Sequence, residues 1–248
     1  MNTKAQDDKG NESFLSTKII PPDERLIFAM DVSSVEEAKS LVGKLGDAVC
    51  FYKLGLQMFM AGGYFEFVEW LRERGKKVFV DLKFFDVPQT VKSAVLQLKD
   101  RDVQFVTVHG NDKIMEAAAA VKHHLKILAV TVLTSLDEGD LKDLGFKCNV
   151  EDLVLSRAKR ALMLGCDGVI SSGLEARGLR SELGNKLLIV APGIRPVANV
   201  DDQKRTVGVK EAFVNGADYI VVGRPIKEAA DPRRAAEDIQ RMIASVFR

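Results

Sequence analysis

The chain has 248 residues, with 36 lysines and arginines against 35 aspartates and glutamates and a formal net charge of +1. This length suits one large domain or two small ones, and the balanced charge gives no electrostatic reason to expect nucleic acid or an anionic membrane surface as a partner. No apolar run approaches the ~20 residues that a transmembrane helix needs. Three cysteines (Cys50, Cys148 and Cys166) are widely spaced and odd in number. They favour a reducing, cytoplasmic setting over disulfides or a metal site.

The first part of the chain differs in composition from the rest. Residues 1–22 are mostly polar and lack the apolar core of a signal peptide. We expect a flexible tail over residues 1–22 and a single catalytic domain over residues 23–248. Within that domain we find no linker and no repeat shorter than one strand–helix unit.

Short apolar runs recur at a steady interval through the domain. They cover residues 25–32, 48–55, 76–84, 103–110, 125–133, 166–173, 186–194 and 217–226. Each run is continuous rather than alternating, which is typical of parallel strands covered on both faces.

The segments between these runs have the spacing of amphipathic helices. Ser33 and Ser34 precede residues 35–45 and can cap a helix whose first turn holds two glutamates. Pro88 opens residues 88–100, as is common in a first helical turn. Further segments of this kind cover residues 63–75 and 235–248.

Eight alternations of strand and helix in this length predict a closed (β/α)8 TIM barrel. The alternative is an open, doubly wound sheet, which normally carries a glycine-rich turn after its first strand. Here the first strand is followed by "DVSSVEEA", which has no glycine. We therefore expect the barrel.

In a barrel, functional residues collect at the carboxyl ends of the strands. The residues at these ends are Asp31, Lys53, Asp81, Lys83, His109, Thr134, Ser135, Ser171, Ser172, Arg195, Gly223 and Arg224. This set predicts a polar site at one end of the barrel.

The third run, within "VFVDLKFFDVPQTV", carries charges in an otherwise apolar strand. Asp81 and Lys83 are two residues apart, so we expect them on one face with Cα atoms about 6–7 Å apart. Asp31 and Lys53 end the two preceding strands, which predicts a patch of alternating charges. Buried charges stay ionised only when paired, and pairing would keep Lys83 protonated as a proton donor.

Asp86 stands at an odd offset from Asp81 and would face the other way on a continuing strand. It must reach its target from a loop or serve a neighbouring subunit. The alternative for the whole set is a structural network of ion pairs at a strand end, which becomes less favourable once Asp31 and Lys53 are included.

The last two strands end in "APGIRP" and "NGADYIVVGRPI". Barrel phosphate sites form from these two loops, with backbone N–H groups and a guanidinium as donors. Gly193 and Arg195 end the seventh strand, and Gly223 and Arg224 end the eighth. The alternative is that Arg224 only pairs with a surface carboxylate.

The histidines carry less information. His109 could line the site, and a structural, hydrogen-bonded histidine is an equal alternative. His123 and His124 are adjacent, which is unsuited to metal binding from one helix face, so we expect them at the surface. We identify no acidic metal-binding set apart from the lysine-paired carboxylates.

Taken together, the motifs resemble the orotidine 5′-monophosphate decarboxylase family, which catalyses the last step of de novo pyrimidine synthesis. The likeness runs from about residue 25 onward and rests on "FAMDV", "FYKLG", "DLKFFDVPQTV", "VTVHG", "VTVLTS", "SSGLEA", "APGIRP", "DDQKR" and "GADYIVVGRPI", in family-like order. The resemblance implies a (β/α)8 barrel that works as a homodimer, without metal or organic cofactor. It also implies a lyase that converts orotidine 5′-monophosphate to UMP and CO2.

The same resemblance implies roles for the charged residues. Lys83 matches the proton donor to C6 of the pyrimidine, and Asp81 matches the carboxylate beside the leaving CO2 group. Asp31 and Lys53 match residues that contact the ribose and complete the charged array.

Other roles follow from the same likeness. Asp86 and Thr90 match residues that act across the subunit interface. Thr134 stands where the family binds the pyrimidine ring, and Gln203 resembles the glutamine that bridges base and phosphate. The implied phosphate site consists of Arg195, Gly223 and Arg224.

Two segments depart from the family pattern. Residues 206–212 read "TVGVKEA" where the family usually has a sequence like "MTPxEA", and "SSGLEA" often begins with cysteine. Neither segment holds a residue with a chemical role. Two rival functions stay open, namely a Mg²⁺-dependent phosphosugar enzyme on a related barrel and a catalytically silent protein that binds a phosphate ligand.

Overall fold

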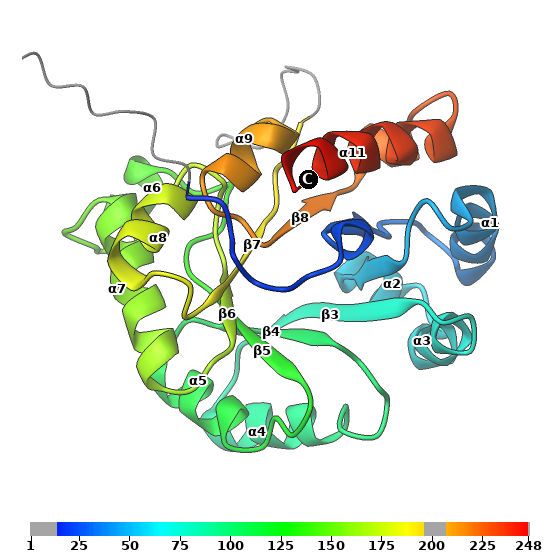
Figure 1. Ribbon diagram of the computed structural model, residues 1–248. Helices are drawn as coiled ribbons and strands as arrows, with labels where there is room; N and C mark the ends of the chain where they lie inside the picture. The colour runs from blue at the N-terminus through cyan, green and yellow to red at the C-terminus, as the bar shows by residue number, and fades with distance from the viewer. Residues whose placement is uncertain (1–13, 196–206, 248) are drawn as a thin grey trace, which may run out of the picture.

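The computed structural model describes residues 14–195 and 207–247. Eight parallel strands close into a barrel in sequence order, with β1 paired to both β2 and β8. Helices surround the strands (Figure 1), and this confirms the expected (β/α)8 barrel. In the described residues, no helix has both the length and the apolar character to cross a membrane.

All eight strands lie inside the apolar runs of the sequence. They are β1 (Leu26–Ala29), β2 (Phe51–Leu54), β3 (Lys77–Phe84), β4 (Phe105–His109), β5 (Lys126–Val130), β6 (Gly168–Ile170), β7 (Leu188–Ala191) and β8 (Tyr219–Val222). The helices of the first half are η1 (Pro22–Glu24), α1 (Val35–Leu45), α2 (Leu56–Met60), α3 (Tyr64–Arg72), α4 (Pro88–Leu96) and α5 (Asp112–Ala119). Those of the second half are α6 (Glu138–Asp143), α7 (Val150–Met163), α8 (Ala176–Leu183), α9 (Val209–Val214), α10 (Arg224–Lys227) and α11 (Pro232–Val246).

Local sequence signals set the helix boundaries. The Ser34 hydroxyl accepts a hydrogen bond from the Glu37 N–H at 3.1 Å, which caps α1 as expected. Pro88 occupies the first turn of α4, where its missing N–H costs no intrahelical bond. These local rules hold because each cap needs only neighbours in the sequence.

The hydrophobic core has two layers, one inside the barrel and one between barrel and helices. The inner layer contains an aromatic cluster in which the Phe105 ring lies 5.0 Å from Phe51 and 5.1 Å from Tyr219. Inner residues alternate along each strand, so Ile27 and Ala29 of β1 both point inward. Continuing this alternation aims the polar residues at the strand ends into the mouth of the barrel.

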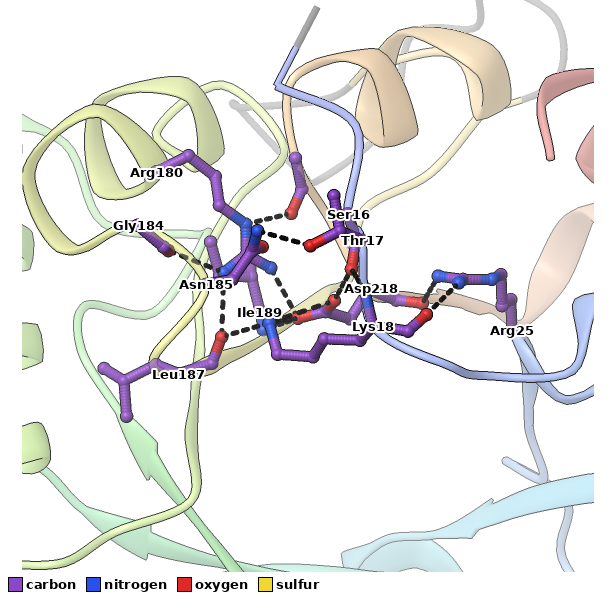
Figure 2. Close-up of polar contacts among 11 residues, drawn as sticks. Ser16, Thr17, Lys18, Arg25, Arg180, Gly184, Asn185, Leu187, Ile189 and Asp218 are labelled. Carbon is purple, nitrogen blue, oxygen red and sulfur yellow. Dashed lines mark hydrogen bonds and ion pairs between the residues drawn. The ribbon is translucent and has the colours of Figure 1, made fainter.

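The opposite end of the barrel is tied to the N-terminal segment (Figure 2). Asp218 has no exposed surface and accepts hydrogen bonds from Ser16 Oγ at 2.5 Å, Arg180 Nη2 at 2.5 Å and the Ile189 N–H at 2.8 Å. Lys18 Nζ lies 3.2 Å from the same carboxylate, and burial lowers the pKa of that lysine. Contacts with the barrel thus begin upstream of residue 23, where the domain was expected to start.

Candidate active site

A cavity of about 240 Å³ lies where the strands end at the mouth of the barrel. Its lining contains nine of the residues singled out from the sequence, namely Asp31, Lys53, Asp81, Lys83, Thr134, Gly193, Arg195, Gly223 and Arg224. The cavity therefore brings the expected charged residues and the expected phosphate-binding residues to one place.

Four charged groups alternate along one wall of the cavity. Lys53 Nζ lies 3.7 Å from Asp31 Oδ1 and 3.2 Å from Asp81 Oδ2. Lys83 Nζ lies 3.0 Å from both carboxylate oxygens of Asp81. We call Asp31, Lys53, Asp81 and Lys83 the charged array. Strand alternation explains three members, because Ala29, Phe51 and Phe79 point inward two residues before Asp31, Lys53 and Asp81.

The array keeps its buried members ionised. Burial favours the neutral form of Asp81, but the ammonium groups of Lys53 and Lys83 outweigh it and hold the Asp81 pKa below its usual value. Burial likewise opposes the charge on Lys53, but Asp81 and Asp31 overcome it and raise the Lys53 pKa. Lys53 and Asp81 therefore face each other in the site as a charged pair at neutral pH.

The fourth member, Lys83, lies in an irregular part of β3, so strand alternation does not explain the position of its side chain. The pairing of β3 with β4 runs from Val80 opposite Val106 to Phe84 opposite Val108, so residues 81–83 face Thr107 alone. The resulting bulge turns the Lys83 backbone to φ +48°, a left-handed conformation that few non-glycine residues adopt. The expected meeting of Asp81 and Lys83 is thus achieved by an irregular strand.

Thr107 occupies the gap that this bulge leaves, and sequence analysis gave it no role. Its hydroxyl donates to Asp81 Oδ1 at 2.9 Å and accepts from the Lys83 N–H at 2.9 Å. The available signal was a single hydroxyl side chain in the apolar run of β4. That signal is weak, because the hydroxyl of a buried threonine often hydrogen-bonds only to a nearby backbone group.

Asp86 and Thr90 lie outside the residues that line the cavity. β3 ends at Phe84, and Asp86 sits in the loop before α4, where its carboxylate accepts from the Val87 N–H at 2.6 Å. Both side chains are exposed. The odd offset of Asp86 from Asp81 does not determine which way Asp86 faces, because β3 has a bulge and ends before it. Its position on a loop is the one expected from the sequence.

The ends of β7 and β8 form the side of the cavity that carries arginines. The Arg195 N–H donates to the Val207 carbonyl at 3.0 Å, which fixes the chain where β7 leads into Arg195. Gly193 has φ +76°, which favours glycine, and a Cβ on Gly223 would lie 3.3 Å from the Ala29 Cβ. Both glycines thus allow the backbone to lie close to the cavity.

The remaining expected residues have mixed positions. Thr134 lines the cavity beside apolar side chains that sequence analysis did not assign to the site, namely Phe79, Val130, Ile170 and Val221. Their common signal was an inward position near the end of a strand. Gln203 lies outside the described residues, as does Thr206, whereas residues 207–212 of the departing segment are described and include the start of α9.

The histidines lie away from the cavity lining. His109 Nδ1 is 2.8 Å from Asn111 Oδ1, and its ring stacks on Phe85 with 4.3 Å between centroids. This environment favours the structural alternative for His109. His123 and His124 are exposed as expected. Across residues 14–195 and 207–247, no three histidine, cysteine, aspartate or glutamate side chains cluster as metal ligands.

Comparison with known proteins identifies relatives along nearly the whole chain. The sequence profile of the Orotidine 5'-phosphate decarboxylase / HUMPS family matches residues 24–239. A protein named orotidine 5'-phosphate decarboxylase from Methylococcus capsulatus is 64% identical over 237 residues, which cover 95% of this chain and 98% of the relative. A protein of the same name from Nitrobacter winogradskyi is 50% identical over 228 residues, covering 91% of this chain and 95% of the relative.

Solved structures agree with these relatives. Orotidine 5'-phosphate decarboxylase from Lactobacillus acidophilus has a TM-score of 0.80 and 34% identity, covering 89% of this chain and 99% of that one. The enzyme of the same name from Pyrococcus horikoshii has a TM-score of 0.72 and 25% identity, covering 88% and 99%. Sequence and fold point the same way, and the chain belongs to the orotidine 5'-phosphate decarboxylase / HUMPS family.

Proposed function

We propose that the chain decarboxylates orotidine 5′-monophosphate to UMP and CO2 in pyrimidine biosynthesis. The observation that carries this proposal is the charged array facing, within one cavity, the arginines at the ends of β7 and β8. A substrate with a phosphate at one end and a carboxylate on a planar ring at the other has charges that suit both walls. Membership of the family supports the same reaction.

In the proposed reaction, the bond between C6 of the pyrimidine and the carboxylate carbon breaks, and its electron pair stays on C6. The carbanion has no conjugated sink for this charge, so stabilisation has to come from a fixed cation. The Lys83 ammonium is the proposed cation, held by Asp81 at 3.0 Å. It then transfers a proton to C6, and the neutral amine regains a proton from solvent.

Asp81 has a second proposed role, against the substrate carboxylate. Two negative charges at about 4 Å in an effective dielectric of about 20 repel each other by roughly 4 kcal/mol. Full relief of this repulsion as CO2 leaves corresponds to about three decades of rate. Lys53 and Lys83 keep Asp81 ionised for this purpose.

The remaining proposed contacts are to the ribose, the base and the phosphate of the substrate. Asp31 and Lys53 are the proposed ribose contacts, and Thr134 and Gln203 the proposed base contacts. The proposed phosphate site combines the Arg195 and Arg224 guanidinium groups with backbone N–H groups near Gly223. These contacts supply binding energy far from the reacting bond.

A homodimer is part of the proposal, with Asp86 and Thr90 serving the partner's site. Large apolar side chains are exposed after β2 and β3, at the same end of the barrel as the cavity. They are Leu56 (60%), Phe59 (43%), Met60 (79%), Phe85 (66%) and Val87 (62%). Exposed apolar groups of this size are typical of a protein interface, and Phe85 and Val87 stand on either side of Asp86 in the chain.

The proposed setting is the cytoplasm. Cys50, Cys148 and Cys166 are free thiols in the described structure. Their state agrees with a reducing compartment.

The direct test is to incubate the purified protein with orotidine 5′-monophosphate and follow the loss of pyrimidine absorbance. We expect turnover without added metal and in the presence of EDTA. In D2O the UMP formed should carry one deuterium at C6. Loss of activity in EDTA, restored by Mg²⁺, would support the rival phosphosugar enzymes, and ligand binding without turnover would support the silent binding protein.

A further inference from the structure

Thr107 lies at the centre of β4 and has no exposed surface. A threonine hydroxyl has one hydrogen to donate and can accept from other groups. Here the hydrogen goes to Asp81 Oδ1 at 2.9 Å, and the oxygen accepts from the Lys83 N–H at 2.9 Å. One hydroxyl therefore contacts both residues of the closest ion pair in the charged array.

The bulge in β3 explains why a side chain is needed at this point. Three residues of β3 face one residue of β4, so the regular ladder of backbone hydrogen bonds is interrupted between Val80 and Phe84. The Lys83 N–H would lack a strand partner at this point. The Thr107 hydroxyl replaces the missing backbone acceptor.

The backbone of Lys83 also needs support. Its φ of +48° is unfavourable for a residue with a side chain, and such conformations persist only where the surroundings hold them. The hydrogen bond to Thr107 acts on the N–H of that same residue. A change in this backbone would move the Lys83 ammonium relative to Asp81.

We propose that Thr107 is a positioning residue, whose hydroxyl sets the Asp81 carboxylate and the Lys83 backbone in the geometry that the reaction uses. This inference rests on the proposed decarboxylation. Thr107 does not line the cavity, so it acts through Asp81 and Lys83 and not on the substrate.

The test is Thr107→Val, which keeps the side-chain shape and removes the hydroxyl. We expect kcat for orotidine 5′-monophosphate to fall about 10- to 100-fold, a barrier increase of about 1.4–2.7 kcal/mol. KM should stay within threefold, because the phosphate and ribose contacts are untouched. Thr107→Ser, which restores the hydroxyl, should bring kcat back to within threefold of wild type.

A matched control is available in Thr131, which is also fully buried and donates to a backbone carbonyl, that of Ile170, at 2.8 Å. Thr131→Val removes a hydroxyl that does not touch the array, so kcat should stay within twofold. Equal losses of kcat in the two valine variants, or a Thr107→Val kcat within threefold of wild type, would overturn the inference. So would a folded Thr107→Ser variant that is as slow as Thr107→Val.

A second measurement does not depend on turnover. Amide hydrogen exchange at Lys83 should be at least tenfold faster in Thr107→Val than in wild type, and unchanged in Thr131→Val. If wild type does not turn over, the proposed function is wrong, and this exchange alone decides whether Thr107 holds Lys83. If Thr107→Val does not fold, Thr107→Ala removes the same hydroxyl and carries the same expectations. Unchanged exchange at Lys83 would refute the positioning role.

Discussion

Replacing Asp81 by asparagine removes the central anion of the charged array and nearly preserves its shape. In the wild type this carboxylate lies 3.0 Å from Lys83 Nζ and 3.2 Å from Lys53 Nζ. At an effective dielectric of about 20, each pair corresponds to about 5 kcal/mol of attraction, before the cost of desolvation. Breaking a buried pair by removing one partner typically costs about 3–5 kcal/mol. Because the Lys83 side chain is 34% exposed, we expect the lower end, about 3 kcal/mol of unfolding free energy.

This loss should depend on pH in a defined way. The folded-state pKa of Asp81 is depressed, so its contribution to stability is present above about pH 3.9 and disappears as pH falls through the lower folded value. The Lys53 pKa is raised, so its contribution is present below about pH 10.4 and disappears as pH rises through the higher folded value. The difference between wild type and Asp81→Asn should therefore be flat from about pH 5 to 9 and shrink below about pH 4.

The assay is urea unfolding followed by circular dichroism and by the fluorescence of Trp70, at one fixed protein concentration. A loss of about 3 kcal/mol corresponds to a Tm decrease of about 6–12 °C for a chain of this size. The control is Asp31→Asn, because Asp31 belongs to the same array but its side chain is 47% exposed and 3.7 Å from Lys53. That change should cost less than about 1 kcal/mol. If Asp81→Asn cost no more than Asp31→Asn at pH 7, the electrostatic account of the array would be wrong.

Three further predictions concern the proposed reaction. Lys83→Ala should lower kcat more than a hundredfold and leave UMP affinity within threefold; a variant with a tenth of wild-type kcat, a loss of only about 1.4 kcal/mol, would contradict the proton-donor role. Arg224→Ala should lower kcat/KM at least tenfold with Tm within about 2 °C of wild type, and a kcat/KM within threefold would count against the phosphate site. Mixing Lys83→Ala with Asp86→Ala protein should restore roughly a quarter of the sites after random subunit exchange, because one site of each mixed two-fold dimer is intact. No recovery after demonstrated exchange would rule out a shared site.

Much of the charged array could be predicted from strand ends. Asp31, Lys53 and Asp81 each follow an inward-pointing residue by two positions, so regular alternation is enough to aim them into the barrel mouth. Lys83 was placed near Asp81 by the same rule, but it reaches that position through a bulge. Strand alternation also predicted that Asp86, at an odd offset from Asp81, would face away from the site. That prediction does not apply, because β3 is irregular and ends at Phe84.

The sequence by itself determined the eight strands, the starts of α1 and α4, and the alternation of strand with helix. These depend on apolar runs and on side chains that bond within a few residues of themselves. Only the tertiary structure decided how β3 and β4 shift in register, which gave Thr107 contact with Asp81 and Lys83, 26 and 24 residues away in the chain. It likewise decided that Ser16 and Lys18 bind Asp218, about 200 residues distant, and so join the N-terminal segment to the barrel. These hydrogen-bond partners are far apart in the chain and meet only when the barrel closes. A local sequence pattern depends on near neighbours and so does not specify them.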